Sequence, residues 1–326
     1  MFRIESTRRI FNRCGWNVSK MFYSSILFQN GLLMIDYCFK IVCLFIFFKE
    51  RMKVLQIPIF EDNYSYLLVD KKYGNAAAID PAEPSTICSV MDKENVTLTD
   101  ILTTHHHWYN YLTCFIIVRL FLFFFNFRDH AGGNEELIKI FPHVRVFGGE
   151  KSISGLNSLV KEGDNISFGG YSISVLETPC HTAGHIVYFI KNNSPPILFS
   201  GDTLFIGGCG RFFEGTASQM AIALLNKLSV LPKDTLVCCG HEYTISNLEF
   251  AQYVEPSNKK ITEKLEWARK KREKNESTVP STIGEELEYN PFMRVNSKEI
   301  RNTLNLTSKC SNEKVIGKLR DMKNSM

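Results

Sequence analysis

Two short stretches decide the fold: Thr103-Thr104-His105-His106-His107-Trp108 and Asp129-His130-Ala131-Gly132-Gly133-Asn134. With residues 109–128 set aside, they join as T-H-H-H-W-D-H-A-G-G-N. This is an H-x-H-x-D-H pattern on His105, His107, Asp129 and His130. Alternate residues at a strand end can direct two imidazoles at one cation, and an Asp and a His shortly after them can serve a second. The pattern therefore predicts a metal centre.

Three further metal-ligand residues lie downstream. His181, Asp202 and His241 each follow a short apolar run typical of a strand, at residues 173–176, 197–199 and 235–237. Ligands in loops after strands indicate layered sheets that present a site at one edge. Further strands are expected at residues 54–59, 64–69, 76–80 and 101–104.

The predicted ligands divide into two sets. We expect His105, His107 and His181 to hold one ion, Asp129, His130 and His241 to hold the other, and Asp202 to bridge both. A hydroxide between two divalent ions is a strong nucleophile near neutral pH, so Asp129 and Asp202 are also the expected catalytic residues. Zinc is the first choice, with iron or manganese as alternatives. The other histidines are expected to be structural, with a supporting role for His185 as an alternative.

These residues resemble the metallo-β-lactamase superfamily, and within it hydroxyacylglutathione hydrolase (glyoxalase II), over residues 52–326 apart from 109–128. The resemblance implies an αββα sandwich at 52–241 and a helical substrate-binding domain at 242–326. It also implies hydrolysis of S-D-lactoylglutathione to D-lactate and glutathione, in methylglyoxal detoxification, by a monomer.

The residues themselves predict helices in the second half of the chain. A helix is expected at 218–231, with Met220, Leu224, Leu228 and Leu231 on one face. After His241, helices are expected at 246–254 and 259–274, and Thr282 with Glu285 indicates a capping box for another.

The substrate-binding residues rest on the resemblance. Arg211 stands where the family usually has Lys, and Phe213 stands where it usually has Tyr, which removes one hydroxyl. Tyr243 matches the family's other binding tyrosine. Arg320 and Lys323 are similar to the family's R-x-x-K pair for a glutathione carboxylate; the alternative is a solvated basic tail.

Composition limits the other classes of function. The chain has 326 residues, of which 44% are hydrophobic and 22% are charged, and a net charge of +4 is too small to indicate nucleic acid as a partner. Ten scattered cysteines fit a reducing compartment. Cys180, next to His181, is a candidate nucleophile; the alternative is a packing residue in a tight turn.

Residues 1–51 form a leader with two parts. The first 20 residues carry one acid, Glu5, and several bases, which is typical of a mitochondrial transit peptide; an arbitrary disordered leader is the alternative. Residues 21–50 are apolar but are interrupted by Asp36 and Lys40, so no membrane anchor is expected. A product initiated at Met52 would be cytosolic, so the mitochondrial matrix and the cytoplasm are both expected locations.

Residues 109–128 interrupt the metal motif with a phenylalanine-rich apolar segment. We interpret this segment as a retained intron or a gene-model error, because the motif closes when it is removed. A genuine hydrophobic or membrane-seeking loop is the alternative. Two rival functions follow: a mononuclear-iron persulfide dioxygenase of the same superfamily, which needs only the first ligand set, or a non-catalytic product inactivated by the insertion.

Overall fold

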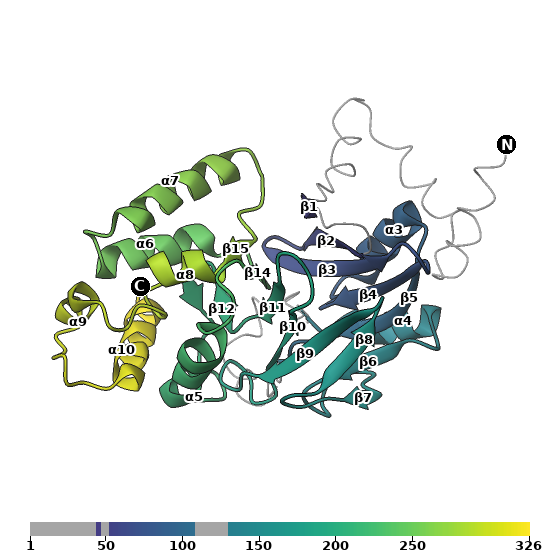
Figure 1. The fold of residues 1–326 in the computed structure, drawn as a ribbon, viewed down its shortest axis with the longest axis horizontal. Helices are drawn as coiled ribbons and strands as arrows, with labels where there is room; N and C mark the ends of the chain where they lie inside the picture. Colours follow the sequence, from purple (N-terminus) through teal and green to yellow (C-terminus); the bar gives the residue numbers. More distant parts are fainter. Residues whose placement is uncertain (1–43, 47–51, 108–129) are drawn as a thin grey trace, which may run out of the picture.

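The computed structural model describes residues 44–46, 52–107 and 130–326 (Figure 1). The predictions made for most of the leader, for the segment 109–128 and for Asp129 lie outside the described residues.

The first sheet has seven strands in the order β1 to β7. Its strands are β1 (Leu44–Ile46), β2 (Met52–Ile59), β3 (Asn63–Asp70), β4 (Asn75–Ile79), β5 (Thr97–Leu102), β6 (Arg145–Gly148) and β7 (Ser158–Leu159). The first four strands pair antiparallel, and β4 to β7 pair in parallel. The loop that carries His105 and His107 therefore leaves this sheet at the end of β5.

The second sheet has six strands in the order β15-β14-β11-β10-β9-β8. They are β8 (Asn165–Phe168), β9 (Tyr171–Glu177), β10 (Ile186–Ile190), β11 (Ile197–Gly201), β14 (Leu236–Cys239) and β15 (Ser281–Thr282). A separate hairpin pairs β12 (Leu204–Phe205) with β13 (Gly208–Cys209). His181, Asp202 and His241 follow β9, β11 and β14, as the sequence predicts.

The two sheets pack face to face. Alternate residues of each strand point to opposite faces, so Val54 of β2 packs between the sheets with Tyr188 of β10, whereas its neighbour Leu55 packs on the outer face. Helices α3 (Pro84–Glu94) and α4 (Asn134–Ile140) cover that outer face through buried residues such as Ile87 and Leu137.

The helices of the second half of the chain pack against the second sheet, most of them on its outer face, whereas Ile261, Leu265 and Ala268 belong to the core between the sheets. The helices are α5 (Ala217–Ala221), η1 (Ile222–Leu228), α6 (Thr244–Val254), α7 (Lys259–Glu273), α8 (Ile283–Tyr289), α9 (Lys298–Thr303) and α10 (Asn312–Asn324). Figure 1 shows α6 to α10 together at the end of the molecule remote from α3 and α4. The architecture is the predicted αββα sandwich with a C-terminal helical region.

Three details refine the predicted elements. The helix expected at 218–231 changes into a π-helix at Ile222 and ends at Leu228. Met220, Leu224 and Leu228 are buried as predicted, whereas Leu231 lies after the helix and is only partly buried. The capping box of Thr282 and Glu285 is present at α8. The strand β15, from the C-terminal region, pairs with β14, so this region is joined to the sandwich through the sheet as well as through helix packing.

Within the part of the chain that the structure describes, no helix is long and apolar enough to cross a membrane.

Candidate metal centre

The first cluster unites the predicted first ligand set. It consists of four residues, each with one ligand atom within 4.8 Å of the others: His105, His107, His181 and Asp202. The Nε2 atom of His107 is 3.2 Å from that of His105 and 3.0 Å from that of His181. The Oδ2 atom of Asp202 is 3.4 Å from Nε2 of His181.

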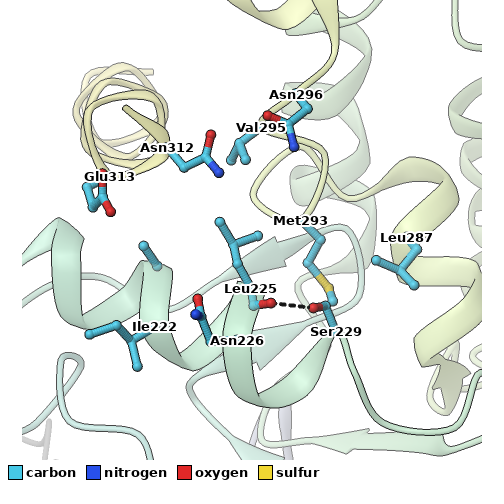
Figure 2. Close-up of a pocket in the computed structure, with 11 residues that line it drawn as sticks. Ile222, Leu225, Asn226, Ser229, Leu287, Met293, Val295, Asn296, Asn312 and Glu313 are labelled. Atoms are coloured by element: carbon cyan, nitrogen blue, oxygen red, sulfur yellow. Dashed lines mark hydrogen bonds between the residues drawn. The ribbon is translucent and has the colours of Figure 1, made fainter. Parts of the chain in front are cut away.

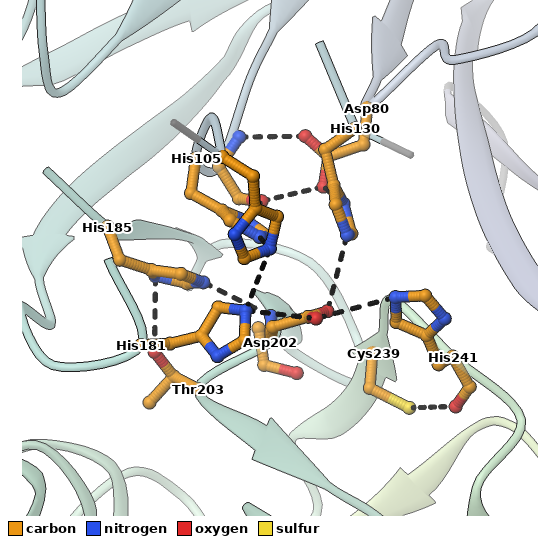
Figure 3. Close-up of polar contacts among 12 residues, drawn as sticks. Asp80, His105, His130, His181, His185, Asp202, Thr203, Cys239 and His241 are labelled. Atoms are coloured by element: carbon orange, nitrogen blue, oxygen red, sulfur yellow. Dashed lines mark hydrogen bonds and ion pairs between the residues drawn. The ribbon is translucent and has the colours of Figure 1, made fainter. Parts of the chain in front are cut away.

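The second cluster shares Asp202 with the first. Ligand atoms of His130, Asp202 and His241 also lie within 4.8 Å of one another. Nε2 of His130 is 3.4 Å from Oδ1 of Asp202, and Nε2 of His241 is 3.4 Å from Oδ2 (Figure 3). Six of the seven predicted ligands therefore converge in the predicted grouping, and the seventh, Asp129, lies outside the described residues.

Each of four histidines has an acceptor on Nδ1. His130 bonds Oδ2 of Asp80 at 3.0 Å, His241 bonds Oδ1 of Asp62 at 3.1 Å, and His181 bonds the carbonyl oxygen of Arg211 at 2.9 Å. The hydroxyl of Thr104 donates to Asp80 at 2.7 Å, so it accepts from Nδ1 of His105 at 2.9 Å. A proton fixed on Nδ1 leaves the Nε2 lone pair directed into the cluster, as a metal ligand requires.

Asp202 fits a cation on independent grounds. Its Oδ1 atom is buried and accepts no hydrogen bond from the described residues. Burial by itself would raise the pKa of this carboxyl, but positive charge at His241, His130 and His181 outweighs burial and holds the pKa well below the usual range, so positive charge at this position keeps Asp202 ionised. A buried, ionised carboxylate facing imidazole lone pairs needs positive charge beside it, so the residues present suit divalent metal ions.

Glycines keep the space around Asp202 open. A Cβ atom at Gly240 would overlap Oδ1 of Asp202, and one at Gly210 would overlap the carbonyl oxygen of Asp202. Only residues without a side chain allow the loops after β13 and β14 to approach the ligand this closely.

His185 supports the site from behind. Its Nδ1 atom lies 2.9 Å from the hydroxyl of Thr178, and its Nε2 atom accepts from the backbone N–H of Asp202 at 3.1 Å. Its ring stacks on that of His105 with centroids 4.7 Å apart. Burial holds the pKa of His185 well below its ordinary value, so the ring stays neutral. This agrees with the supporting role predicted as the alternative.

Cys180 has a structural role. The side chain is fully buried, its Sγ donates to the carbonyl oxygen of Thr216 at 3.3 Å, and burial raises the pKa of the thiol to about 12. A thiol held protonated in this way is a poor nucleophile.

Three of the five predicted substrate-binding residues contact metal-ligand residues, namely Arg211 through its backbone and Phe213 and Tyr243 through their rings, whereas Arg320 and Lys323 contact Cys209 and Asn247. Arg211 is exposed and lies two residues after Cys209, whose carbonyl oxygen accepts from Arg320; Lys323 follows Arg320 by three residues on α10, so the three cations lie in one group. Arg320 is only 5% exposed and donates from Nη1 to the carbonyl oxygen of Cys209 at 3.0 Å; Lys323 donates to Oδ1 of Asn247. The alternative of a solvated basic tail is therefore wrong for Arg320.

Two exposed aromatic rings lie against the metal ligands. Tyr243 is 39% exposed and stacks on His241 at 4.7 Å with an interplanar angle of 7°. Phe213 is 52% exposed, and its ring centroid lies 5.1 Å from that of His181. Both rings offer an apolar face at the rim of the site.

Sequence reasoning missed the carboxylates that hold the ligands. Asp80 ends the strand predicted at 76–80, and Asp62 lies between the strands predicted at 54–59 and 64–69; an acidic residue at a strand end was the available signal. Glu242, directly after the ligand His241, was also not predicted to have a role, but its carboxylate accepts from the hydroxyl of Tyr64 at 2.7 Å and from the backbone N–H of Thr278 at 2.9 Å.

A cavity of about 440 Å³ lies elsewhere, between η1, α8 and the start of α10 (Figure 2). Its lining includes Leu225, Met293 and Asn312 but none of the predicted site residues.

Comparison with known proteins identifies the two parts of the chain. The family model of the metallo-beta-lactamase superfamily matches residues 129–241, and that of the hydroxyacylglutathione hydrolase C-terminus matches residues 242–326. Among solved structures, ETHE1 from Myxococcus xanthus has a TM-score of 0.52 at 24% identity, covering 82% of this chain and 99% of that one. A metallo-beta-lactamase from Staphylococcus aureus also has a TM-score of 0.52, at 21% identity, covering 82% of this chain and 72% of that one. At these identities the likeness shows the fold alone.

Curated relatives are more similar. The cytoplasmic hydroxyacylglutathione hydrolase of Arabidopsis thaliana is 45% identical over 261 residues, which cover 79% of this chain and 93% of the relative. The hydroxyacylglutathione hydrolase-like protein of Gallus gallus is 44% identical over 253 residues, which cover 77% of this chain and 83% of the relative. The chain therefore belongs to the hydroxyacylglutathione hydrolase family of the metallo-β-lactamase superfamily.

Proposed function

We propose that this hydrolase converts S-D-lactoylglutathione to D-lactate and glutathione. The observation that carries the proposal is the position of the cation group formed by Arg211, Arg320 and Lys323. Arg320 bonds the carbonyl oxygen of Cys209, two residues before Arg211, and the carbonyl oxygen of Arg211 accepts from His181, so Arg320 lies beside the loop that contacts a metal ligand. An acyl thioester bound through its glutathione part would thus be placed beside the metal ligands.

The metal-binding roles form part of the proposal. His105, His107 and His181 would hold one ion, and Asp129, His130 and His241 the other, with Asp202 facing both. Divalent cations at such sites lower the pKa of a water molecule and polarise a carbonyl. Zinc is proposed first, since histidine and carboxylate ligands suit zinc, iron and manganese alike. Metal analysis of the purified protein tests the number and identity of the ions.

The chain's own residues would orient the substrate. Two of the cations would bind a glutathione carboxylate, because charge-assisted hydrogen bonds to carboxylates are among the stronger polar contacts. The rings of Phe213 and Tyr243 would cover the apolar parts of the bound thioester. A thiolate then leaves the acyl carbon without prior protonation, because the pKa of a free thiol is only about 8.5.

The decisive test compares the full chain with the same chain lacking residues 109–128, measuring S-D-lactoylglutathione hydrolysis. If only the deletion is active, the segment is an artefact or defines an inactive isoform, and the proposed activity stands. Activity of both means that Asp129 and His130 bind metal despite the segment. If neither is active with metal bound, the glutathione substrate is wrong.

Oxygen uptake with glutathione persulfide separates the hydrolase from the rival dioxygenase. We expect none, because that activity uses only the first ligand set and leaves the second without a role. Persulfide-dependent uptake by the iron-loaded protein would favour the rival.

The remaining assignments follow from the same proposal. We propose that residues 52–241 form the hydrolase domain and residues 242–326 the substrate-binding region, in a monomer of the mitochondrial matrix or cytoplasm. Cell fractionation and light scattering test location and oligomeric state. Stable recovery with membranes would instead favour the non-catalytic alternative.

A further inference from the structure

The hairpin of β12 and β13 connects the metal centre with the C-terminal helices. Its first strand begins two residues after Asp202, and its second strand ends two residues before Arg211. The carbonyl oxygen of Arg211 accepts from Nδ1 of His181 at 2.9 Å. The two ends of the hairpin therefore carry one proposed metal ligand and orient another.

Side chains of the C-terminal region bond the hairpin backbone at every position from 205 to 209. Asn290 donates to the carbonyl oxygens of residues 205 and 208 at 3.3 and 3.0 Å, and Asn247 donates to that of residue 206 at 3.0 Å. Glu286 accepts from the N–H of residue 207 at 2.9 Å, and Arg320 donates to the carbonyl oxygen of residue 209 at 3.0 Å. The hairpin backbone is thus held by side chains from α6, α8 and α10 and from the residue after α8.

Glu286 and Asn290 form the centre of this arrangement, and both are fully buried. Oε2 of Glu286 accepts from Gly207 and from Nδ2 of Asn290, both at 2.9 Å. Its Oε1 accepts from the hydroxyls of Ser281 at 2.6 Å and Tyr289 at 2.9 Å. Loss of this acceptor would leave the buried N–H of Gly207 without a hydrogen-bond partner, which destabilises the position of the hairpin turn.

The hairpin turn is shaped for this contact. Gly207 has a φ of +68°, and a Cβ atom there would lie 2.9 Å from Cδ2 of Leu248. A Cβ atom at Gly208 would lie 2.6 Å from the side-chain carbon of Asn247. Two glycines therefore let the backbone come close enough for the C-terminal side chains to bond it directly.

We propose that Glu286 and Asn290 are positioning residues for the metal centre, which hold the hairpin so that Asp202 and the carbonyl oxygen of Arg211 keep their places. This inference rests on the proposed metal-dependent function. It makes metal affinity depend on the C-terminal region, which contributes no residue to either cluster. Arg320 belongs to the same arrangement, so substrate binding and metal geometry share one support.

A matched pair of substitutions isolates the hydrogen bond. In Glu286→Gln, the amide oxygen can still accept from Gly207 and Asn290. Its NH₂ group can donate to Ser281 and Tyr289, because hydroxyl groups both donate and accept. Glu286→Met has a similar volume but provides no acceptor. We expect the Gln variant to resemble the parent and the Met variant to lose the hairpin's anchor.

The measurement is Co²⁺ binding to the metal-free full-length chain, by chelator competition and by the visible spectrum of the bound ion. We expect Glu286→Met to weaken Co²⁺ affinity about 10–100-fold, the range for residues that support ligands, and to change the spectrum. Glu255→Met is the control, since Glu255 is also buried in the helical region but bonds Arg294 and Ser297 rather than the hairpin. The control should lower the melting temperature and leave affinity and spectrum unchanged.

Parent-like Co²⁺ affinity and spectrum in a folded Glu286→Met protein would overturn the proposal, as would an equal loss in the Gln variant. If the Met variant fails to fold, Asn290→Ser decides by the same criteria, since it removes the donor to the hairpin but leaves room for water. No substrate enters these measurements. A parent protein that binds Co²⁺ but does not hydrolyse lactoylglutathione would refute the proposed function without affecting this one.

Discussion

At the scale of single residues, Asp80 bonds one histidine from each cluster, His130 directly and His105 through Thr104. In Asp80→Asn, an amide placed with its NH₂ toward His130 would donate to Nδ1 and shift the ring proton to Nε2, the atom that must bind metal. In the opposite orientation, the NH₂ group would face the backbone N–H of Thr104, and two donors cannot bond each other. In the parent this N–H donates to Oδ1 of Asp80 at 2.7 Å. We therefore expect metal affinity to fall about 10–100-fold, measured as metal retained after dialysis against a chelator.

Asp100→Asn is the matched control for this change. Asp100 is also buried in the first sheet, but it pairs with Arg145 at 2.6 Å and belongs to neither cluster. An equal loss of metal in both variants would mean that Asp80 acts only through general stability.

Lys323 provides a prediction at the same scale. Burial, followed by the charge of Arg320, lowers the pKa of Lys323 to about 7. The ammonium group is charged below this pKa and neutral above it, so its attraction for a substrate carboxylate fades as the pH rises through about 7. We expect kcat/KM to fall over this range through a rising KM. Lys323→Arg, which stays charged, should flatten the profile; an unchanged profile would remove Lys323 from substrate binding.

At the scale of elements, the capping box at the start of α8 sets the direction of the helix that carries Glu286. The side chain of Thr282 accepts from the N–H of Glu285, whose side chain accepts in return from the backbone N–H of Thr282. We expect Thr282→Ala to lower the free energy of unfolding by about 1 kcal/mol, measured by urea denaturation. Thr282→Ser keeps the oxygen and should stay near the parent; an equal loss in both would assign the effect to the lost methyl group.

The strands and ligand loops could be predicted from the sequence, whereas the contacts that support them could not. The strands and ligand loops were predictable because a short apolar run followed by His or Asp is a local pattern. The supporting contacts were not, because they join distant segments: His241 and Asp62 are 179 residues apart, and Gly207 and Glu286 are 79 apart. Periodicity likewise predicted the buried face of the helix at 218–231 but not its π-helical hydrogen bonding, since both ladders keep Met220 and Leu224 inside.

At the scale of the whole molecule, the sandwich and the helical region share a sheet strand, a hairpin and the substrate cations. β15 extends the second sheet from the C-terminal side, and Arg320 reaches from α10 to the hairpin that follows Asp202. Unfolding of the helical region would therefore expose a sheet edge and release the hairpin together. We infer that the two regions unfold in one cooperative step, which coincident transitions in near-UV and far-UV circular dichroism would test.

Glu286 should make the free energy of unfolding depend on pH. Burial raises the pKa of its carboxyl from 4.5 to about 7, despite four hydrogen-bond donors. The folded protein therefore holds this proton more tightly than the unfolded chain. The resulting stabilisation is complete below pH 4.5 and is lost as the pH rises to about 7. Each unit of pKa corresponds to about 1.4 kcal/mol, so the change amounts to at most about 3 kcal/mol.

Glu286→Gln has no carboxyl group to titrate at this position. As the pH rises from 4.5 to about 7, the free energy of unfolding of the parent should therefore fall relative to that of the variant. Urea denaturation of the metal-free proteins at several pH values measures it without interference from metal release. A difference that does not vary with pH would mean that the carboxylate is ionised throughout. In that case the four donors around it, which join the hairpin, β15 and α8, would outweigh the cost of burying its charge.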